Sequence, residues 1–148
     1  MTKSLPRKSL VLYADDDPDD RLLVGEAFQA YAQTVELVTF PDGLGLLQFV
    51  DRLNTYPPPC LIILDVNMPK LNGKDTLKRI REMDHLAHVP AVLFTTSTLP
   101  SEAAFANAYK AGFLTKPLDE GQMMEVIDQF IDHCGEETKK QIRRHKNG

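Results

Sequence analysis

The chain lacks the features that would place it outside the ordinary globular class. Its 148 residues include no tryptophan and only two cysteines, a count that does not indicate a disulfide scaffold and favours a reduced, cytoplasmic setting. Its longest apolar runs, such as LVLYA and CLIIL, fall far short of the roughly 20 residues that a membrane span needs. We therefore expect neither a membrane segment nor a targeting peptide.

A large excess of one charge is also absent. The net charge is -4, with 43% hydrophobic and 26% charged residues, which excludes wholesale disorder and argues against nucleic acid as the main partner. A chain of this length makes one domain, which we predict over 1–134. From 135 to 148 the sequence loses its hydrophobic period and becomes basic. We expect a frayed helix or a basic tail there, either a solubilising end or a partner-binding segment.

Apolar segments of strand length alternate five times with helical patterns. The predicted strands are 10–14, 35–40, 60–64, 91–94 and 113–115. Helical spacing of apolar residues follows each of them, most clearly over 123–131, where Asp119 would be the N-cap. This alternation implies right-handed crossovers and an α/β fold with a doubly wound, five-stranded parallel sheet. The partly alternating segment 35–40 is typical of an edge strand.

Polar residues follow four of these strands at their carboxyl ends. They are Asp15, Asp16 and Asp17 after the first strand, Asp65 after the third, Thr95 after the fourth and Lys116 after the fifth. In an open α/β sheet these ends meet at one edge, where ligands bind. Crowded carboxylates at a buried strand end are tolerable when a cation neutralises them, and oxygen ligands suit Mg²⁺. Acids, a metal, a hydroxyl and a lysine together indicate a phosphoryl site.

Other interpretations of these residues are weaker. Asp17 before Pro18 has the pattern of a helix cap. The acids from Asp15 to Glu26 have the spacing of a calcium loop, but Asp20 stands where that loop needs glycine, and a strand precedes it. No G-x-G-x-x-G follows the first strand, which argues against a dinucleotide-binding fold. The Gly73-Lys74 region lacks the earlier glycine of a phosphate loop. The histidines and cysteines do not have the spacing of zinc ligands.

Four segments, in order, carry a resemblance to a known family. LVLYADDDPDDR, LIILDVNMPKLNGKDTLKRIR, PAVLFTTS and FLTKPLD resemble the receiver domain of bacterial two-component response regulators, over about 9–133. The resemblance implies the chemotaxis-regulator-like, flavodoxin-like (βα)5 fold with strand order 2-1-3-4-5, in a stand-alone receiver without an output domain.

The resemblance also implies roles for individual residues. Asp65 matches the phosphoacceptor and Lys116 the lysine that pairs first with Asp65 and then with a phosphoryl oxygen. Thr95 matches the hydroxyl residue that turns inward after phosphorylation, and Phe113 the aromatic switch position. The implied metal is Mg²⁺, with Mn²⁺ as an alternative, and its ligand set is Asp15, Asp16, Asp65 and the backbone carbonyl of Asn67.

Some positions depart from the family pattern. Thr96 stands where the family usually has Ala, Gly or Ser, and the segment before Lys116 lacks the common G-A-N/D-D spacing that would place Phe113. The turn from Met68 to Gly73 agrees with one that closes over the site, and there we predict a positive φ at Gly73.

These features predict a single-domain response regulator. It would accept a phosphoryl group on Asp65 from a histidine kinase or phosphotransfer protein, lose it slowly, and bind a downstream protein or a second copy through the fourth helix, fifth strand and fifth helix. It would be a phosphoacceptor switch rather than a turnover enzyme, with no DNA-binding domain.

The main alternative is a haloacid-dehalogenase-like phosphatase with Asp15 as nucleophile and Asp17 as acid/base, which leaves Asp65 unexplained. A degenerate receiver serving as a scaffold is a third interpretation.

Overall fold

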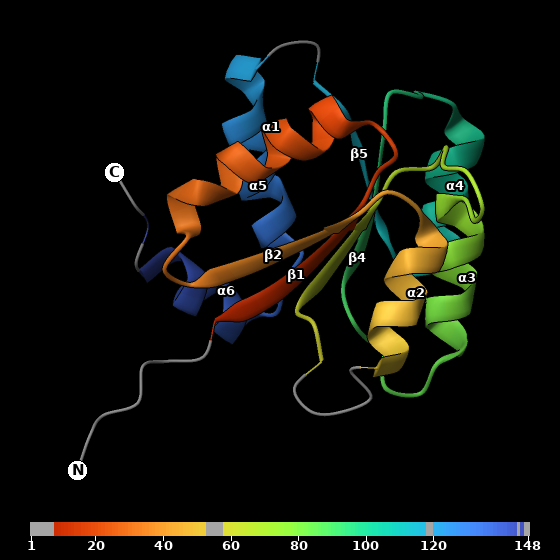
Figure 1. Cartoon of the computed structure of the whole chain (residues 1–148), viewed down its shortest axis with the longest axis horizontal. Coiled ribbons are helices and arrows are strands. Elements are labelled where there is room, and N and C mark those ends of the chain that lie inside the picture. Colours follow the sequence, from red (N-terminus) through yellow and green to blue (C-terminus); the bar gives the residue numbers. More distant parts are fainter. Residues whose placement is uncertain (1–7, 53–57, 118–119, 145, 147–148) are drawn as a thin grey trace.

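Five parallel strands form the centre of the structure, a computed structural model that describes residues 8–52, 58–117, 120–144 and 146 (Figure 1). The strands are β1 (Ser9–Ala14), β2 (Val35–Phe40), β3 (Leu61–Leu64), β4 (Ala91–Thr95) and β5 (Gly112–Thr115). They lie in the order β2-β1-β3-β4-β5, all parallel, so the predicted sheet and its order are confirmed. The partly polar β2 occupies one edge, as its alternation predicts.

Helices cover both faces of the sheet. They are α1 (Pro18–Phe28, extended by the 3-10 turn η1, Gln29–Tyr31), α2 (Gly43–Arg52), α3 (Gly73–Glu82), α4 (Pro100–Ala108), α5 (Met123–Asp132, preceded by the 3-10 turn η2, Glu120–Gln122) and α6 (Glu136–Arg144). In Figure 1 α1, α5 and α6 lie on one side of the sheet, and α2, α3 and α4 on the other. No helix among the described residues is long and apolar enough to cross a membrane.

Successive strand residues supply the two faces of the core alternately. On the side of α1 and α5, Tyr13 and Phe94 pack with Phe130, and the Phe94 and Phe130 rings meet edge to face at a centroid distance of 5.0 Å. On the other side Leu64 and Leu93 pack with the residues of α2 and α3. This two-sided burial explains why the central strands are unbroken apolar runs.

The apolar faces predicted for the helices are largely as expected. In α5 the apolar residues with helical spacing over 123–131 are buried: Met123, Val126, Ile127, Phe130 and Ile131. Helix α1 begins at the predicted cap, where the Asp17 carboxylate accepts a hydrogen bond from the Asp19 amide at 2.8 Å. Asp119, the predicted cap of α5, lies outside the described residues, as does Leu53, which has helical spacing with Leu46 and Val50 in the sequence. In α4 only Glu102 and Ala106 are buried, which agrees with its weak apolar stripe.

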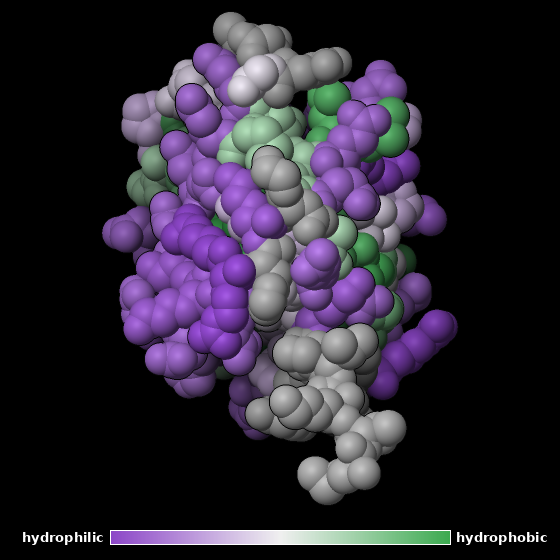
Figure 2. Space-filling model, turned by 90° about the vertical axis from the view of Figure 1, so that its left-hand side faces the viewer, coloured by the Kyte–Doolittle hydropathy of each residue, from purple (hydrophilic) through white to green (hydrophobic). Residues whose placement is uncertain are grey.

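The C-terminal residues form a helix that packs against α5 and the turn before β2. Ile142 of α6 is completely buried, and the Thr34 hydroxyl donates to its carbonyl oxygen at 2.8 Å. Arg143 donates to the Asp132 carboxylate at 2.9 Å. Figure 2 shows that the side of the molecule carrying these helices is mostly hydrophilic. The division into a receiver domain and a basic tail stays a prediction.

The turn after β3 differs from the sequence expectation in one respect. Positive φ occurs at Lys70, with φ 65°, and not at Gly73, so the prediction for Gly73 was wrong. Gly73 is instead the first residue of α3, behind the Asn72 cap. A Cβ on Gly73 would lie 2.1 Å from the carbonyl oxygen of Asp65. The glycine is needed because the backbone of α3 approaches the end of β3 closely.

We predict that Gly73→Ala lowers the free energy of unfolding by roughly 1–3 kcal/mol, the usual cost of overpacking a tight site. Gly25→Ala is the matched control, since a Cβ on this α1 residue meets nothing within 4 Å. The control should stabilise the protein by about 0.5–1 kcal/mol, because alanine favours the helix. Urea unfolding of both variants checks this, and equal stabilities would contradict the close approach.

Candidate functional site

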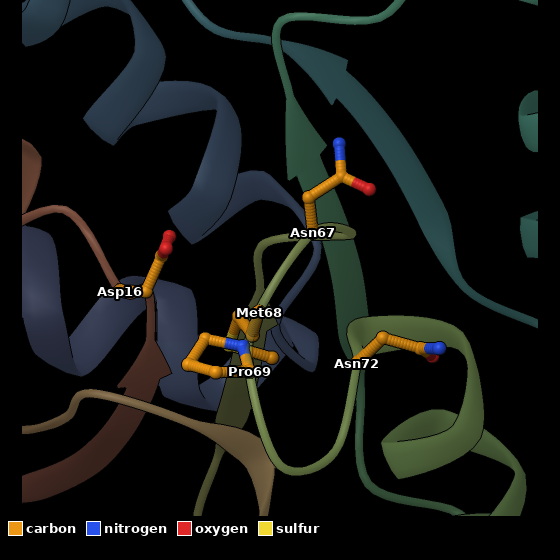
Figure 3. Close-up of a pocket in the computed structure, with 5 residues that line it drawn as sticks. All are labelled: Asp16, Asn67, Met68, Pro69 and Asn72. Carbon is orange, nitrogen blue, oxygen red and sulfur yellow. The ribbon is translucent and has the colours of Figure 1, made fainter.

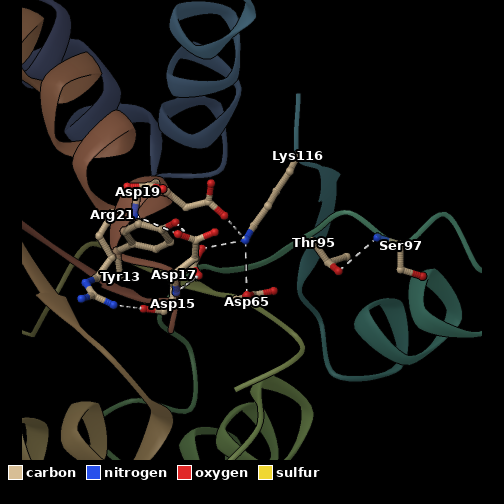
Figure 4. A network of polar contacts seen from close by, with 10 residues as sticks. Tyr13, Asp15, Asp17, Asp19, Arg21, Asp65, Thr95, Ser97 and Lys116 are labelled. Carbon is tan, nitrogen blue, oxygen red and sulfur yellow. Dashed lines mark hydrogen bonds and ion pairs between the residues drawn. The ribbon is translucent and has the colours of Figure 1, made fainter. Parts of the chain in front are cut away.

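The carboxyl ends of β1, β3 and β5 bring two acids and a lysine together (Figure 4). Side chains two residues apart on a strand share a face, so Asp15 continues the face of Tyr13, and Lys116 continues that of Leu114. Asp15 is completely buried and Asp65 is nearly so. The structure therefore brings these three side chains together at the edge of the sheet where the strand ends were expected to meet.

Lys116 is the cation shared by this cluster. Its Nζ lies 2.7 Å from Asp20 Oδ2, 2.8 Å from Asp15 Oδ2 and 3.3 Å from Asp65 Oδ2. To reach these acids from β5 the lysine crosses β4, where its Nζ stands 5.7 Å from the centroid of the Phe94 ring. At this distance the π-face of the ring attracts the ammonium.

Asp15 is held on both carboxylate oxygens. The Tyr13 hydroxyl donates to Oδ2 at 2.5 Å, and the Asp17 amide donates to Oδ1 at 3.0 Å. The Arg21 guanidinium donates to the backbone carbonyl of Asp15 at 2.6 Å. Burial and the neighbouring Asp15 carboxylate raise the pKa of Tyr13 above its ordinary value, so the phenol remains a donor. These contacts fix the orientation of Asp15.

Three carboxylates lie close enough to share one cation. One carboxylate oxygen from each of Asp15, Asp16 and Asp65 lies within 4.8 Å of the other two. Asp16 is exposed, and it lines an open pocket with Asn67, Met68, Pro69 and Asn72 (Figure 3). Two buried acids and one exposed acid beside an open pocket suit a hard divalent cation, which takes oxygen ligands and keeps some of its waters.

The electrostatics of Asp65 also fit a site that needs a cation. Burial and, to a smaller extent, the Asp15 charge raise the pKa of the Asp65 carboxyl, Lys116 opposes them, and the net result is a pKa of about 6. Burial alone would lower the pKa of Lys116, but its hydrogen bonds to Asp15 and Asp20 outweigh burial and raise it above the ordinary value. The Lys116 ammonium therefore stays charged, but its single charge does not fully neutralise the acids Asp15, Asp20 and Asp65 around it.

The predicted switch residues lie on the two strands beside the cluster. Thr95 is buried, its hydroxyl accepts from the Ser97 amide at 3.2 Å, and its carbonyl accepts from the Lys116 amide at 2.7 Å. Phe113 is half-buried on β5, opposite Leu93 of β4, and packs on the core face shared with α4. Their roles in switching stay predictions, as do the roles of the other site residues.

The contacts of Tyr13, Asp20 and Arg21 at this site were not predicted from the sequence. Asp20 was considered only as a residue that breaks a calcium loop, and Arg21 was given no role. Asp20 comes three residues after the Asp17 cap, in the first turn of a helix that starts at the strand ends. From this position in the first turn, a further carboxylate at the site could have been predicted.

Comparisons with known proteins agree with this geometry. Residues 11–128 match the family model described as the response regulator receiver domain. Response regulator Rcp1 from Synechocystis sp. is 36% identical over 98 residues, which are 64% of this chain and 66% of that protein. The structure of the Mn²⁺-bound form of response regulator Rcp1 has a TM-score of 0.72 at 27% identity, covering 80% of this chain and 88% of that chain. Chemotaxis protein CheY4 of Vibrio cholerae has a TM-score of 0.69 at 25% identity, covering 84% and 99%.

We predict that Asp65→Asn stabilises the metal-free protein at neutral pH by roughly 1–3 kcal/mol, since one pKa unit corresponds to about 1.4 kcal/mol. The raised pKa means that the fold favours the protonated carboxyl. The gain should therefore be smallest below pH 3.8, grow as the pH rises to about 6, and then level off. Urea unfolding with a chelator at several pH values measures it. Asp84→Asn, at an exposed position, should show no such pH profile. A stability change in Asp65→Asn that does not depend on pH would contradict the raised pKa of Asp65.

Proposed function

Because the chain belongs to the response regulator receiver domain family, whose members are phosphoacceptor switches, we propose that Asp65 accepts a phosphoryl group. The donor would be a histidine kinase or a histidine phosphotransfer protein. The observation that supports this proposal best is the position of Asp65, which joins the carboxylates of Asp15 and Asp16 on one side and the ammonium of Lys116 on the other. An acid, a metal-binding set and a lysine are the parts that phosphoryl transfer uses.

Asp65 is better suited to be the nucleophile than Asp15. Asp15 is completely buried, and three groups occupy its two carboxylate oxygens. The Asp65 carboxylate pairs with Lys116 at the longer distance of 3.3 Å. In the proposed step an Asp65 oxygen bonds to phosphorus while the bond from phosphorus to the donor nitrogen breaks, and the electron pair leaves with that nitrogen. This assignment disfavours the dehalogenase-like alternative, which needs Asp15 to attack.

Receiver domains bind a divalent metal, and the carboxylates here fit one. We propose Mg²⁺, with Mn²⁺ as an alternative, held by Asp15, Asp16, Asp65 and the carbonyl of Asn67. When bound, it supplies positive charge that offsets both the acids and the phosphoryl oxygens. Lys116 would donate to a phosphoryl oxygen once Asp65 is modified, since a phosphoryl group offers strong acceptors.

The signal would leave through the surface formed by α4, β5 and α5. When the Thr95 hydroxyl turns toward the phosphoryl group it vacates space, and Phe113 is the nearby large side chain that would fill it. In α4 only Glu102 and Ala106 are buried, so moving this helix disturbs little packing. The described residues form no DNA-binding domain, and we propose output to a partner protein or a second copy, in the cytoplasm, ended by slow self-dephosphorylation.

We predict that acetyl phosphate with Mg²⁺ adds one phosphoryl mass to the wild-type chain and none to Asp65→Asn, because the acceptor oxygen is gone. Asp15→Asn should label at a reduced rate, since Asp65 is intact and the metal ligand set is weakened. Intact-mass spectrometry measures both variants. Labelling of Asp65→Asn together with loss of labelling in Asp15→Asn would instead support the dehalogenase-like mechanism.

We also predict that beryllofluoride, a phosphoryl mimic, changes amide hydrogen exchange across 96–117. The reason is that Thr95 and Phe113 connect the acceptor to α4 and β5. Hydrogen-exchange mass spectrometry with and without the mimic tests this, with β2 as the internal reference that should not change. Changes limited to the loops that carry Asp15 and Asp65 would rule out this route.

A further inference from the structure

The shortest ion pair of Lys116 is formed with a residue that the proposed transfer step does not use. Asp20, in the first turn of α1, places Oδ2 2.7 Å from Nζ, against 3.3 Å for the Asp65 oxygen. The Asp20 side chain is 28% exposed and that of Lys116 is 9% exposed, so the pair is largely shielded from solvent. Salt therefore screens it less than it would a surface pair.

Three acids compete for a single positive charge. The Asp15 carboxylate is held by the Tyr13 hydroxyl and the Asp17 amide, so the fold fixes its contact with the Lys116 ammonium. Asp20 and Asp65 approach Lys116 from different elements, α1 and the end of β3. A short contact to Asp20 draws the ammonium toward α1, and the attraction between unit charges falls with distance. The longer contact to Asp65 agrees with this competition.

We propose that Asp20 is a positioning residue that holds Lys116 toward α1 and thereby weakens the contact between Lys116 and the phosphoryl group on Asp65. The inference rests on the proposed function, because it concerns the phosphorylated acceptor. To reach a phosphoryl oxygen the ammonium must give up part of its present contacts, and the Asp20 contact is the shortest of them. Asp20 would thus weaken the binding of a phosphoryl mimic beside Asp65.

The chain offers a matched control at the next position. Asp19 is exposed, carries the same charge and lies in the same first turn of α1, but among the described residues it forms no ion pair with Lys116. Asp19→Asn and Asp20→Asn therefore remove the same charge and a similar favourable interaction with the helix dipole. A difference between them reports the contact with Lys116.

The test compares wild type with Asp20→Asn, Asp19→Asn and Asp20→Glu, each at one Mg²⁺ concentration. Asp20→Asn should bind beryllofluoride at least about threefold more tightly, the scale of a partly buried ion pair. Asp19→Asn should stay close to wild type, and Asp20→Glu should restore wild-type behaviour. Thermal melting separates these effects from a loss of folding, and Asp20→Ser repeats the test if the asparagine variant is unstable.

A measurement without metal or phosphoryl group supplies a second readout. The NMR signal of the Lys116 ammonium should shift in Asp20→Asn and stay in place in Asp19→Asn, because only the first loses a direct partner. Equal beryllofluoride affinities for the two variants would overturn the inference while labelling at Asp65 still supports the proposed function. If wild type and Asp65→Asn both fail to label, the proposed function itself is wrong.

Discussion

One buried ammonium among several carboxylates is the interaction on which the arrangement of the site depends. Lys116 starts from β5, passes the Phe94 ring of β4 and reaches acids from β1, from the end of β3 and from α1. In the order β1-β3-β4-β5 the lysine spans β4 to make these contacts. The fold therefore places one charge where residues distant in the chain can share it.

The same interaction explains why the site would accept a metal and a phosphoryl group. Lys116 supplies one positive charge to Asp15, Asp20 and Asp65, and Asp16 adds a further carboxylate beside them. Burial and the Asp15 charge raise the pKa of Asp65 to about 6, and the remaining negative charge favours a divalent cation. The proposed phosphoryl group on Asp65 would add acceptor oxygens close to the lysine and so change the partners of Lys116.

Much of this could be predicted from the sequence, for physical reasons that are specific to each element. The central strands are unbroken apolar runs because both of their faces are covered, and α5 has a complete apolar stripe because it packs along the sheet. Asp17 and Pro18 mark the start of α1 by local capping chemistry alone. The position of Asp15, Asp65 and Lys116 follows from the rule that parallel strands end at one edge.

Other features depend on contacts that no local pattern encodes. The Asp20–Lys116 pair joins residues 96 positions apart and depends on the side-chain conformation chosen in α1. Gly73 was expected to supply positive φ, but it is required by the close approach of α3 to the Asp65 carbonyl, a tertiary distance. The helix α6 is polar almost throughout and is anchored by the single buried side chain of Ile142, too weak a signal to predict packing.

The most direct test of the account is to identify the phosphorylated residue chemically. Borohydride reduces an acyl phosphate to an alcohol, so a phosphorylated aspartate becomes homoserine and can be located by peptide sequencing. After incubation with acetyl phosphate and Mg²⁺, we expect homoserine at position 65 and nowhere else. Homoserine at position 15, or no conversion in a chain that has gained a phosphoryl mass, would contradict it.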